Sequence, residues 1–522
     1  MLRLPLRSLR SAPPAPPTVA ASLVLLMAGG CRAAEAPPPP PPSPVPLHWP
    51  VGAPAPLTAA QPVLWVALAA RLAPPAPPAP AAPLRLRAAQ GALTLTDAGG
   101  RRFTAPDLEL HWTRRSLVVP LQLRRQVQGP FSSYESAEAA ARAWAPAGVV
   151  RIARPRDWEV WAPAGVTPPA GVTTRLLERR ERQRLGLELR RASGPVPLEG
   201  PLRIEAPGGL AWQGGVYAGP FRLQADAHGS WTLLEQVPLE RYLEGVVPHE
   251  IGAGSPPAAL AAQAVLARTW AVRNRHRFVV DGYHLCADTQ CQVYKDPRHA
   301  GAGVRQAIAA TRGQVLAWRG EPIHAVYHAS NGGVSAGFEE AWSGPSRPYL
   351  RVALDGPTAF TSRWTLPLAT DGVGRLLRNG QEAYGSDHPS FRWQRRLSPA
   401  AVAKALAGDG PPLGAVRRLE VAERGASGRV VALRIVGATG TRVLRRDAIR
   451  RTFRQLPSTL FTVQAAAGGG WLLAGGGFGH GAGLSQAGAI DLGRRGWSAA
   501  AILRHYYPGT ELQPLQSLGD AP

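Results

Sequence analysis

A glutamate and a histidine in distant segments of the chain could together serve a reaction on a polymer. Glu250 ends the apolar segment 239–250, where a partly desolvated carboxyl group would suit a general acid. His480 lies in the glycine-rich loop 475–486, and glycines let another molecule approach the backbone closely. About 230 residues separate the two, so only a folded domain could bring them together. The sequence therefore predicts one groove that holds both.

A second candidate site lies in the segment 284–291, which contains His284, Cys286 and Cys291. Histidine and cysteine are common zinc ligands, but a zinc ion usually takes four ligands and the segment supplies three. His249 and His324 are the candidates for the fourth. The two cysteines could instead form a small-loop disulfide in an oxidising compartment, or remain free thiols. The sequence leaves a structural zinc ion, a disulfide and free thiols open.

The N-terminus resembles an export signal. Three arginines within residues 1–10 precede an apolar run at 19–27 that is too short for a membrane-spanning helix. The segment 28–31 then resembles a lipoprotein processing site, in which Cys31 would be acylated and would anchor the protein to a membrane. We expect export to the periplasm or cell envelope, with or without this anchor.

The composition agrees with a folded, basic protein that carries a stiff tether. The formal net charge is +24, and 45% of the residues are hydrophobic, enough for a sizeable core. The charge could reflect base composition or attraction to a polyanion such as nucleic acid, lipid headgroups or anionic cell wall. The basic residues are scattered without a long block, and the chain carries an export signal, so we expect no nucleic-acid partner.

The pattern of strands and helices predicts an α+β protein with mostly antiparallel strands and several short helices. We expect a signal at 1–36, a Pro/Ala-rich tether at 37–82, an accessory α+β domain at 83–200, a catalytic domain at 201–515 and a tail at 516–522. Helices are expected near 136–145, 255–275, 445–454, 485–494 and 498–505, with Ser255 as the N-cap of the second. A hairpin turn is expected at 425–428.

Several separated motifs resemble the stage II sporulation protein D family and its amidase-enhancer relatives. They are Val237–Glu250, Leu260–Ala271, Cys291–Tyr294, Ala310–Leu316, His328–Gly333, the glycine–histidine loop and His505–Thr510. The resemblance covers roughly 200–515. The accessory segment loosely resembles a small sporulation-related repeat domain that binds glycan strands; a family-specific accessory domain is the alternative.

The family resemblance implies a peptidoglycan lytic transglycosylase that acts on glycan strands stripped of peptides. The matching glutamate, Glu250, would protonate the bond between N-acetylmuramic acid and N-acetylglucosamine and then act as a base. The 6-hydroxyl of the sugar would close an internal anhydro ring, so neither a second carboxylate nor a cofactor is required. A two-carboxylate glycosidase would differ in this respect.

The remaining motif residues are predicted to bind the glycan, and a purely structural role is the alternative for each. Gln263 could hydrogen-bond an N-acetyl group, while Arg268 points to a different helix face and is a weaker candidate. Ser485 could cap a helix whose free N–H groups face the substrate, and His480 could bind the glycan or orient Glu250. The predicted binding set is Gln263, Arg268, Tyr294, Ser330, Gly332, Gly333, His480, Ser485 and Gln486.

The sequence is also compatible with three other functions. The same fold could serve a non-catalytic glycan-binding protein that stimulates a cell-wall amidase. A zinc hydrolase could be built on the segment 284–291, which metal analysis and a chelator would test. A nucleic-acid binder would fit the net charge alone.

Overall fold

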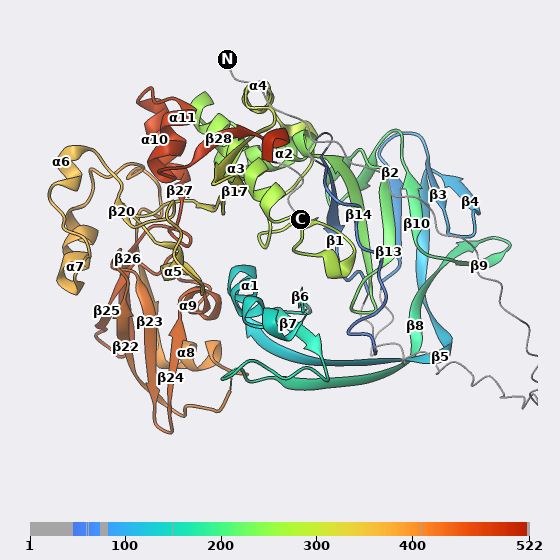
Figure 1. Cartoon of the computed structure of the whole chain (residues 1–522), viewed down its shortest axis with the longest axis horizontal. Helices are drawn as coiled ribbons and strands as arrows, with labels where there is room; N and C mark the ends of the chain where they lie inside the picture. The colour runs from blue at the N-terminus through green and yellow to red at the C-terminus, as the bar shows by residue number, and fades with distance from the viewer. Residues whose placement is uncertain are drawn as a thin grey trace, which may run out of the picture. The chain divides into compact units, whose positions relative to one another are not determined.

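The computed structural model describes residues 45–518, apart from 59, 61, 74–81, 149 and 409. The predicted signal at 1–36 and the candidate lipidation site Cys31 lie outside the described residues. The described part combines helices with mostly antiparallel strands, which confirms the predicted α+β class (Figure 1). Among the described residues, no helix is both long enough and apolar enough to cross a membrane.

The first large sheet joins strands that lie far apart in the sequence. Its order is β15 (Leu285–Cys286), β1 (Val63–Ala69), β14 (Trp231–Pro238), β13 (Phe221–Ala225), β10 (Leu202–Glu205), β3 (Leu93–Thr96) and β4 (Arg102–Ala105). Neighbouring strands are antiparallel except β1 and β15, which run parallel. This sheet leads directly into the helices that carry Glu250.

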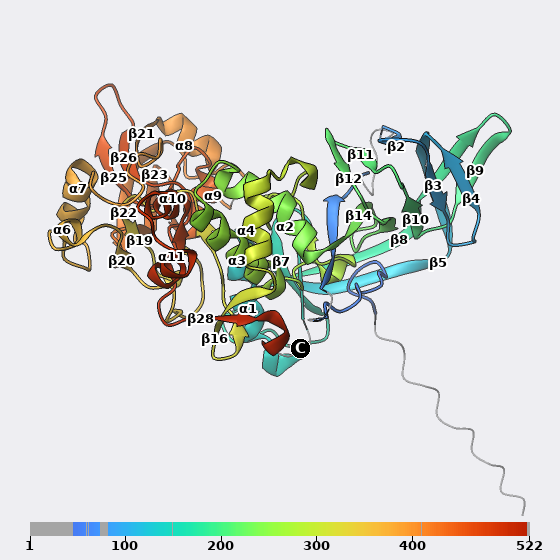
Figure 2. The ribbon, with the colours of Figure 1, turned by 90° about the horizontal axis from the view of Figure 1, so that it is seen from above.

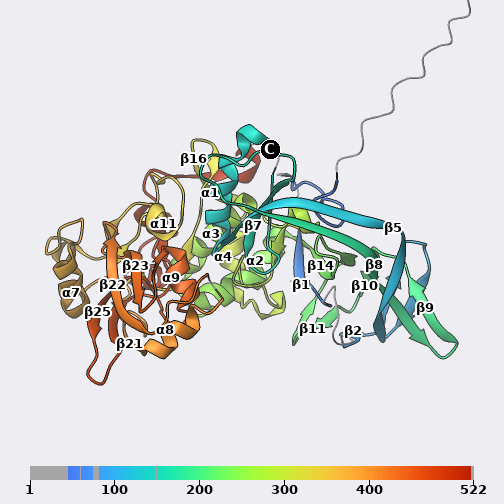
Figure 3. The same ribbon diagram turned by 90° about the horizontal axis from the view of Figure 1, so that it is seen from below.

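The second large sheet is built on a long two-stranded ribbon. Its order is β12 (Gly215–Tyr217), β11 (Leu210–Trp212), β2 (Leu84–Ala88), β5 (Asp107–Phe131), β7 (Trp158–Pro163) and β6 (Arg151–Ala153). The strand β8 (Arg175–Arg191) also pairs with β5, and β9 (Gly194–Leu198) pairs with β8. Figure 3 shows β5 and β8 running side by side.

The predicted boundaries at 82–83 and 200–201 do not separate structural domains. Strand β1 lies inside the predicted tether but pairs with β14, and β3 pairs with β10 across the second boundary. Strand β2 pairs likewise with β11. The alternating burial of β2 and β3 explains why the predicted boundary fails. Each strand has one apolar face that must be covered, and its partner strands come from beyond residue 200.

A group of helices follows the first sheet. It comprises α2 (Leu239–Val247), the π-helical turn η2 (Pro248–Gly252), α3 (Pro257–Arg273), α4 (Ala302–Ala310), α10 (Gln486–Arg494) and α11 (Ala499–Tyr506). Figure 2 shows α2, α3 and α4 close together, and α3 packs against both α10 and α11. Almost every α3 side chain is buried because helices surround it. The predicted N-cap Ser255 is wrong: its hydroxyl donates to the Ile251 carbonyl, and Pro256 occupies the cap position.

The segment after α4 and its following strands forms further sheets and helices around two smaller hydrophobic clusters, and its first residues pack into the main core. One sheet has the order β21 (Arg392–Leu397), β26 (Trp471–Gly476) and β25 (Phe461–Ala465), and another has β22 (Val416–Arg424), β23 (Val430–Gly437) and β24 (Thr441–Arg445). The predicted hairpin turn at 425–428 is confirmed between β22 and β23. The helices are α5 (Phe338–Ala341), α6 (Thr358–Thr361), α7 (Thr370–Asn379), α8 (Pro399–Ala405) and α9 (Asp447–Thr452).

Short elements complete the described chain. They are α1 (Tyr134–Ala143), β16 (Gln314–Trp318), β17 (Glu321–Pro322), β18 (Tyr327–His328), β19 (Val334–Ser335), β20 (Ala353–Leu354), β27 (Leu484–Ser485), β28 (Glu511–Pro514), and the single turns η1 (Ala145–Ala147), η3 (Val279–Asp281), η4 (Pro297–His299) and η5 (Leu515–Leu518). The predicted helices near 136–145, 445–454, 485–494 and 498–505 are confirmed with small shifts of their ends.

Candidate active site

Glu250 lies on the turn η2, directly after the helix α2. The apolar side of α2 is buried, which holds the turn against the core and leaves the glutamate side chain half-buried. The Val293 N–H donates to its Oε1 at 2.8 Å. Burial raises the pKa of Glu250, while hydrogen bonds from the Val293 N–H and the Tyr327 hydroxyl oppose that rise. The carboxyl group is therefore fixed in position and biased toward its protonated form.

A chain of hydrogen bonds sets the direction in which Tyr327 donates its proton. The Tyr242 hydroxyl donates to Gln292 Oε1 at 3.2 Å, and Gln292 Nε2 donates to the Tyr327 hydroxyl oxygen at 2.9 Å. Because Tyr327 accepts from the amide, its own proton is free for Glu250. The sequence interpretation missed Tyr327 and Gln292. The only available signal was that Gln292 lies within a family motif and Tyr327 directly precedes another.

A cavity of about 820 Å³ opens beside Glu250. Trp158, Trp270, Trp342 and Tyr327 contribute aromatic rings to its walls, together with His480. Charged and polar side chains, seven of them arginines, line the cavity between these rings, so its chemistry suits a polar ligand such as a sugar polymer. Glu250 and His480 thus line one cavity, as the sequence predicted, although the described residues contain no hydrogen bond between them.

His480 is held by the backbone. Its Nε2 donates to the Tyr327 carbonyl oxygen at 2.9 Å, and its Nδ1 accepts from the Ala482 N–H at 3.2 Å. The ring lies 4.7 Å from that of Trp342, centre to centre. Burial lowers the pKa of His480 to about 3, so the imidazole is neutral. Both ring nitrogens are used within the chain, so His480 positions Tyr327 and presents a ring face, with no nitrogen left for a substrate.

The glycines of the loop 475–486 bring the chain close to itself. A Cβ at Gly477 would lie 2.5 Å from the Ser330 carbonyl oxygen, and one at Gly483 would lie 2.1 Å from the Val326 oxygen. Both glycines also have positive φ angles. Ser330 exchanges backbone hydrogen bonds with Phe478, and Gly332 and Gly333 are buried beside it. The polar turn 330–333 is therefore a docking surface for the loop and does not line the cavity.

Ser485, Gln486 and Gln263 join two helices behind the cavity wall. The predicted cap is confirmed, because the Ser485 hydroxyl accepts from the Gly488 N–H and begins α10. Gln486 Nε2 donates to Gln263 Oε1 at 3.3 Å, which links α10 to α3. All three side chains are buried and none lines the cavity. The prediction that they contact substrate does not fit this placement.

Arg268 and Tyr294 are each bonded to a carboxylate outside the cavity. Arg268 forms a bidentate ion pair with Glu240, in which its Nε and Nη2 each lie 2.7 Å from a carboxylate oxygen. The Tyr294 hydroxyl donates to Glu235 at 2.9 Å, and burial raises the pKa of Glu235 to about 7. Both side chains are buried. Their contacts make them supports of the fold and not the glycan contacts that the sequence predicted.

The residues 284–291 do not fit a zinc site. The sulfurs of Cys286 and Cys291 are joined in a disulfide, which removes the thiolates that zinc requires. His284 is occupied on both nitrogens: Nδ1 accepts from the Trp65 N–H at 2.9 Å, and Nε2 donates to the Ala55 carbonyl at 3.1 Å. Across the part of the chain that the structure describes, no three His, Cys, Asp or Glu residues gather as a metal site.

Unfolding experiments with a reductant and with a chelator distinguish the disulfide from a zinc site. Reducing it should lower the free energy of unfolding by about 2 kcal/mol, a modest loss because the closed loop is short. Urea unfolding with and without reductant measures this, and the double variant Cys286→Ser/Cys291→Ser should no longer respond to reductant. Loss of stability on adding a chelator would contradict the disulfide and favour zinc.

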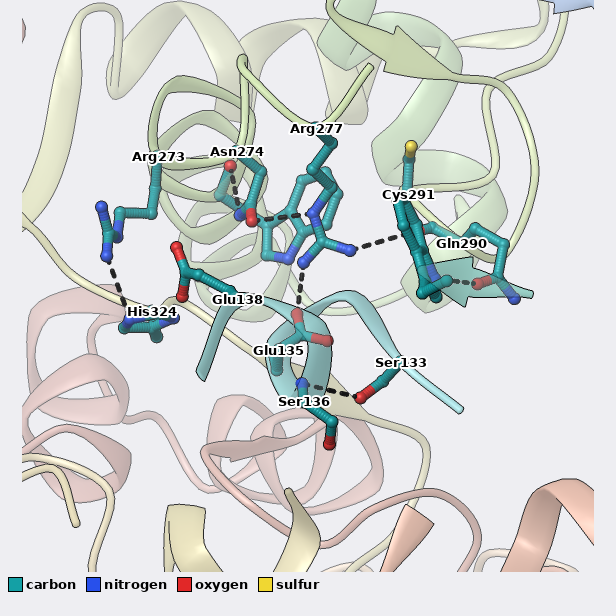
Figure 4. Close-up of polar contacts among 12 residues, drawn as sticks. Ser133, Glu135, Ser136, Glu138, Arg273, Asn274, Arg277, Gln290, Cys291 and His324 are labelled. Atoms are coloured by element: carbon teal, nitrogen blue, oxygen red, sulfur yellow. Dashed lines mark hydrogen bonds and ion pairs between the residues drawn. The ribbon is translucent and has the colours of Figure 1, made fainter. Parts of the chain in front are cut away.

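The helix α1 closes one side of the cavity, although it belongs to the segment that the sequence set apart as an accessory domain. Ser133 caps it, and Glu135 in its first turn forms an ion pair with Arg277 (Figure 4). Arg277 also donates to the Asn274 side chain at 2.9 Å and to the Gln290 carbonyl at 3.1 Å. These contacts fix the wall to the segment just before Cys291.

Two family models match this chain. One, described as Stage II sporulation protein, covers residues 227–318 and so includes Glu250, Gln292 and the disulfide. The other is described only as a domain of unknown function and covers 336–483, which includes α9 and His480. The cavity therefore takes its walls from both matched regions, from the residues between them, which include Tyr327, and from the segment before them.

Curated relatives agree with the first match. The stage II sporulation protein D of Bacillus amyloliquefaciens is 29% identical over 300 residues, which are 54% of this chain and 76% of the relative. The amidase enhancer of Bacillus subtilis (strain 168) is 28% identical over 294 residues, 52% of this chain but only 40% of the relative. The stage II sporulation protein D of the same strain is 26% identical, covering 53% and 75%.

Proposed function

Because this chain is a relative of the stage II sporulation protein D and amidase enhancer proteins, we propose that it is an exported lytic transglycosylase of peptidoglycan. Its substrate is the glycan strand stripped of peptides, and it cleaves the bond between N-acetylmuramic acid and N-acetylglucosamine. The observation that carries the proposal is the half-buried carboxyl group of Glu250 beside an aromatic-walled cavity, with a raised pKa.

In the proposed reaction Glu250 donates its proton to the glycosidic oxygen, which leaves as the 4-hydroxyl of N-acetylglucosamine. The 6-hydroxyl of the muramic acid residue attacks the anomeric carbon and closes the 1,6-anhydro ring. Its proton returns to the Glu250 carboxylate, so the reaction consumes no water and regenerates the acid. Tyr327 and the Val293 N–H hold the carboxyl group in place and stabilise the charge between the two proton transfers.

The other acidic groups in the cavity favour a one-carboxylate mechanism. Glu135 and Asp157 are ion-paired with arginines, while Glu340 accepts from the Ser427 N–H and hydroxyl. Asp447 accepts hydrogen bonds from Ser133 and Ser136, and Asp288 is exposed and accepts from the Gln290 N–H. Glu250 is proposed as the acid because it combines partial burial and a raised pKa with a place in the segment that resembles the stage II sporulation protein. A hydrolytic pair would require a second available carboxylate at a defined separation.

A non-catalytic role is the second candidate, favoured by the similarity to an amidase enhancer. In that role the same cavity would hold a glycan strand while a separate cell-wall amidase acts on it. Digestion of peptide-free glycan strands, with mass analysis of the products, separates the two roles. Anhydro ends support the transglycosylase, ordinary reducing ends indicate hydrolysis, and intact strands support the enhancer.

The pH dependence of cleavage should report Glu250. The reaction needs its protonated form, so kcat/KM should fall as the pH rises through its raised pKa. The Tyr327→Phe variant loses a hydrogen bond that lowers the pKa of Glu250. The pKa therefore rises further, and the alkaline limb of the pH profile of kcat/KM should move to higher pH. Tyr384→Phe, the same change outside the cavity, should leave the limb in place. A shift of the Tyr327→Phe limb to lower pH would contradict the assignment.

A further inference from the structure

The cavity beside Glu250 is lined by seven arginines. Arg156 and Arg454 are exposed, Arg154 lies over the Trp158 ring, and three others are bonded to the protein. Arg277 and Arg451 form ion pairs with carboxylates of the N-terminal segment. Arg446 donates to the backbone carbonyl of Glu339 at 2.7 Å. These three hold the walls of the cavity together, so their charges are not available to a ligand.

Arg450 differs from its neighbours. It lies on α9, one helical turn after Arg446, and lines the same cavity as Glu250 and His480. Its Nε is buried without a partner, and among the described residues its guanidinium has neither a hydrogen bond nor an ion pair. Burial lowers the pKa of Arg450, and no carboxylate offsets that effect. Its charge therefore has no counter-charge among the described residues, on the wall of the cavity that also contains the proposed catalytic acid.

Polar groups on the same helix or in the same cavity are bonded elsewhere. Asp447, on the same helix, accepts from the hydroxyls of Ser133 and Ser136. Glu340 is bonded to Ser427. His480 is neutral and its nitrogens are occupied. A partly buried charge without a partner carries a desolvation cost, so the arrangement favours a ligand that brings an anion to this wall.

We propose that Arg450 binds the free carboxylate of the lactyl group on a peptide-stripped muramic acid residue. The inference rests on the proposed function, because it concerns the same substrate and cavity. In a peptide-bearing strand this carboxyl group is tied up as a neutral amide, whereas removal of the peptide exposes a carboxylate. The planar guanidinium fork matches a carboxylate and does not match an amide. Arg450 thus makes the cavity selective for strands that have lost their peptides.

The test compares two forms of one polymer. Peptide-free glycan strands carry the lactyl carboxylate, and the same strands coupled to methylamine carry a neutral amide of similar size. We expect the wild type to prefer the acid form roughly ten- to hundredfold in kcat/KM, mainly through KM, as for hydrogen bonds to charged groups. Arg450→Met should bring the ratio of the two forms close to one, and Arg450→Lys should restore part of it.

Controls separate recognition from folding. Arg445→Met removes an exposed arginine of the adjacent strand, ion-paired with Glu423, and should keep the wild-type preference. Thermal unfolding of each variant checks that Arg450→Met is folded. Unchanged preference in a folded Arg450→Met protein, or equal losses on both strand forms, would overturn the proposal.

Binding in a Glu250→Gln background keeps the inference apart from the proposed function. Calorimetry should show that Arg450→Met weakens binding of acid strands roughly ten- to hundredfold and removes their advantage over amide strands. If the wild type cleaves nothing but this carboxylate-dependent binding is found, the transglycosylase proposal fails and the arginine proposal stands. If cleavage occurs without any difference between strand forms, or if neither form binds, the arginine proposal fails.

Discussion

Replacing Glu250 with glutamine should abolish the release of anhydro ends, with a fall in rate of about 10³–10⁴-fold. A positioned general acid contributes about 10²–10⁴-fold, and Glu250 is proposed to serve as both acid and base, which places the effect at the upper end. Glutamine keeps the shape of the side chain and can still accept from the Val293 N–H. The fold and the affinity for the glycan should therefore remain. Mass analysis of digested peptide-free strands measures the loss.

A matched variant tests whether any glutamate of this region would give the same result. Glu244 lies on α2, close in sequence to Glu250, and is ion-paired with Arg241 at the surface. Glu244→Gln should cleave at close to the wild-type rate. Cleavage by Glu250→Gln within tenfold of the wild type would rule out the proposed proton donor. If the wild type released ordinary reducing ends, Glu250 would remain the proposed acid, but the reaction would be hydrolysis.

Removing the charge of Arg268 should destabilise the protein by about 3–5 kcal/mol, the usual cost of breaking a buried ion pair from one side. The Arg268 side chain is 0% exposed and the side chain of its partner Glu240 is 18% exposed. Arg268→Met would leave Glu240 without its counter-charge and the Gln314 carbonyl without its donor. Urea unfolding measures the loss.

Arg241→Met is the matched control for this prediction. It breaks the surface ion pair with Glu244, where the Arg241 side chain is 38% exposed, and should cost at most about 1 kcal/mol. Under conditions where it is folded, Arg268→Met should bind glycan strands with little change, because Arg268 does not line the cavity. A stable Arg268→Met protein with weakened glycan binding would restore Arg268 to the binding set that the sequence predicted.

Local features of this protein were predictable because neighbours in sequence produce them. The capping serine Ser485, the helices near 485–494 and 498–505 and the hairpin turn at 425–428 all depend on a few consecutive residues. The predicted cap at Ser255 failed for a local reason as well. Its hydroxyl is turned toward the preceding turn, where it donates to the Ile251 carbonyl, and the helix begins one residue later than expected, with Pro256 at the cap position.

The roles of the binding residues could not be predicted, because a residue type does not reveal its partner. Gln263 and Arg268 have the chemistry to bind a sugar, but each has a partner within the protein. The loop glycines suggested close approach by a polymer, whereas the chain itself fills that space. For Tyr327 the sequence offered only its place directly before a motif, since its hydroxyl acquires its direction from Gln292 and Tyr242.

The sequence by itself indicated the α+β class, the similarity to stage II sporulation protein D and Glu250 as the candidate acid, since strand patterns and contiguous motifs are written in consecutive residues. Only the tertiary structure decided that segments before residue 200 share sheets with those after it, that α1 and α9 complete the cavity, and that Arg450 faces it without a partner. The physical reason is that burial and pairing over long distances depend on the whole folded chain, and they set which polar groups are consumed by the fold and which remain for a ligand.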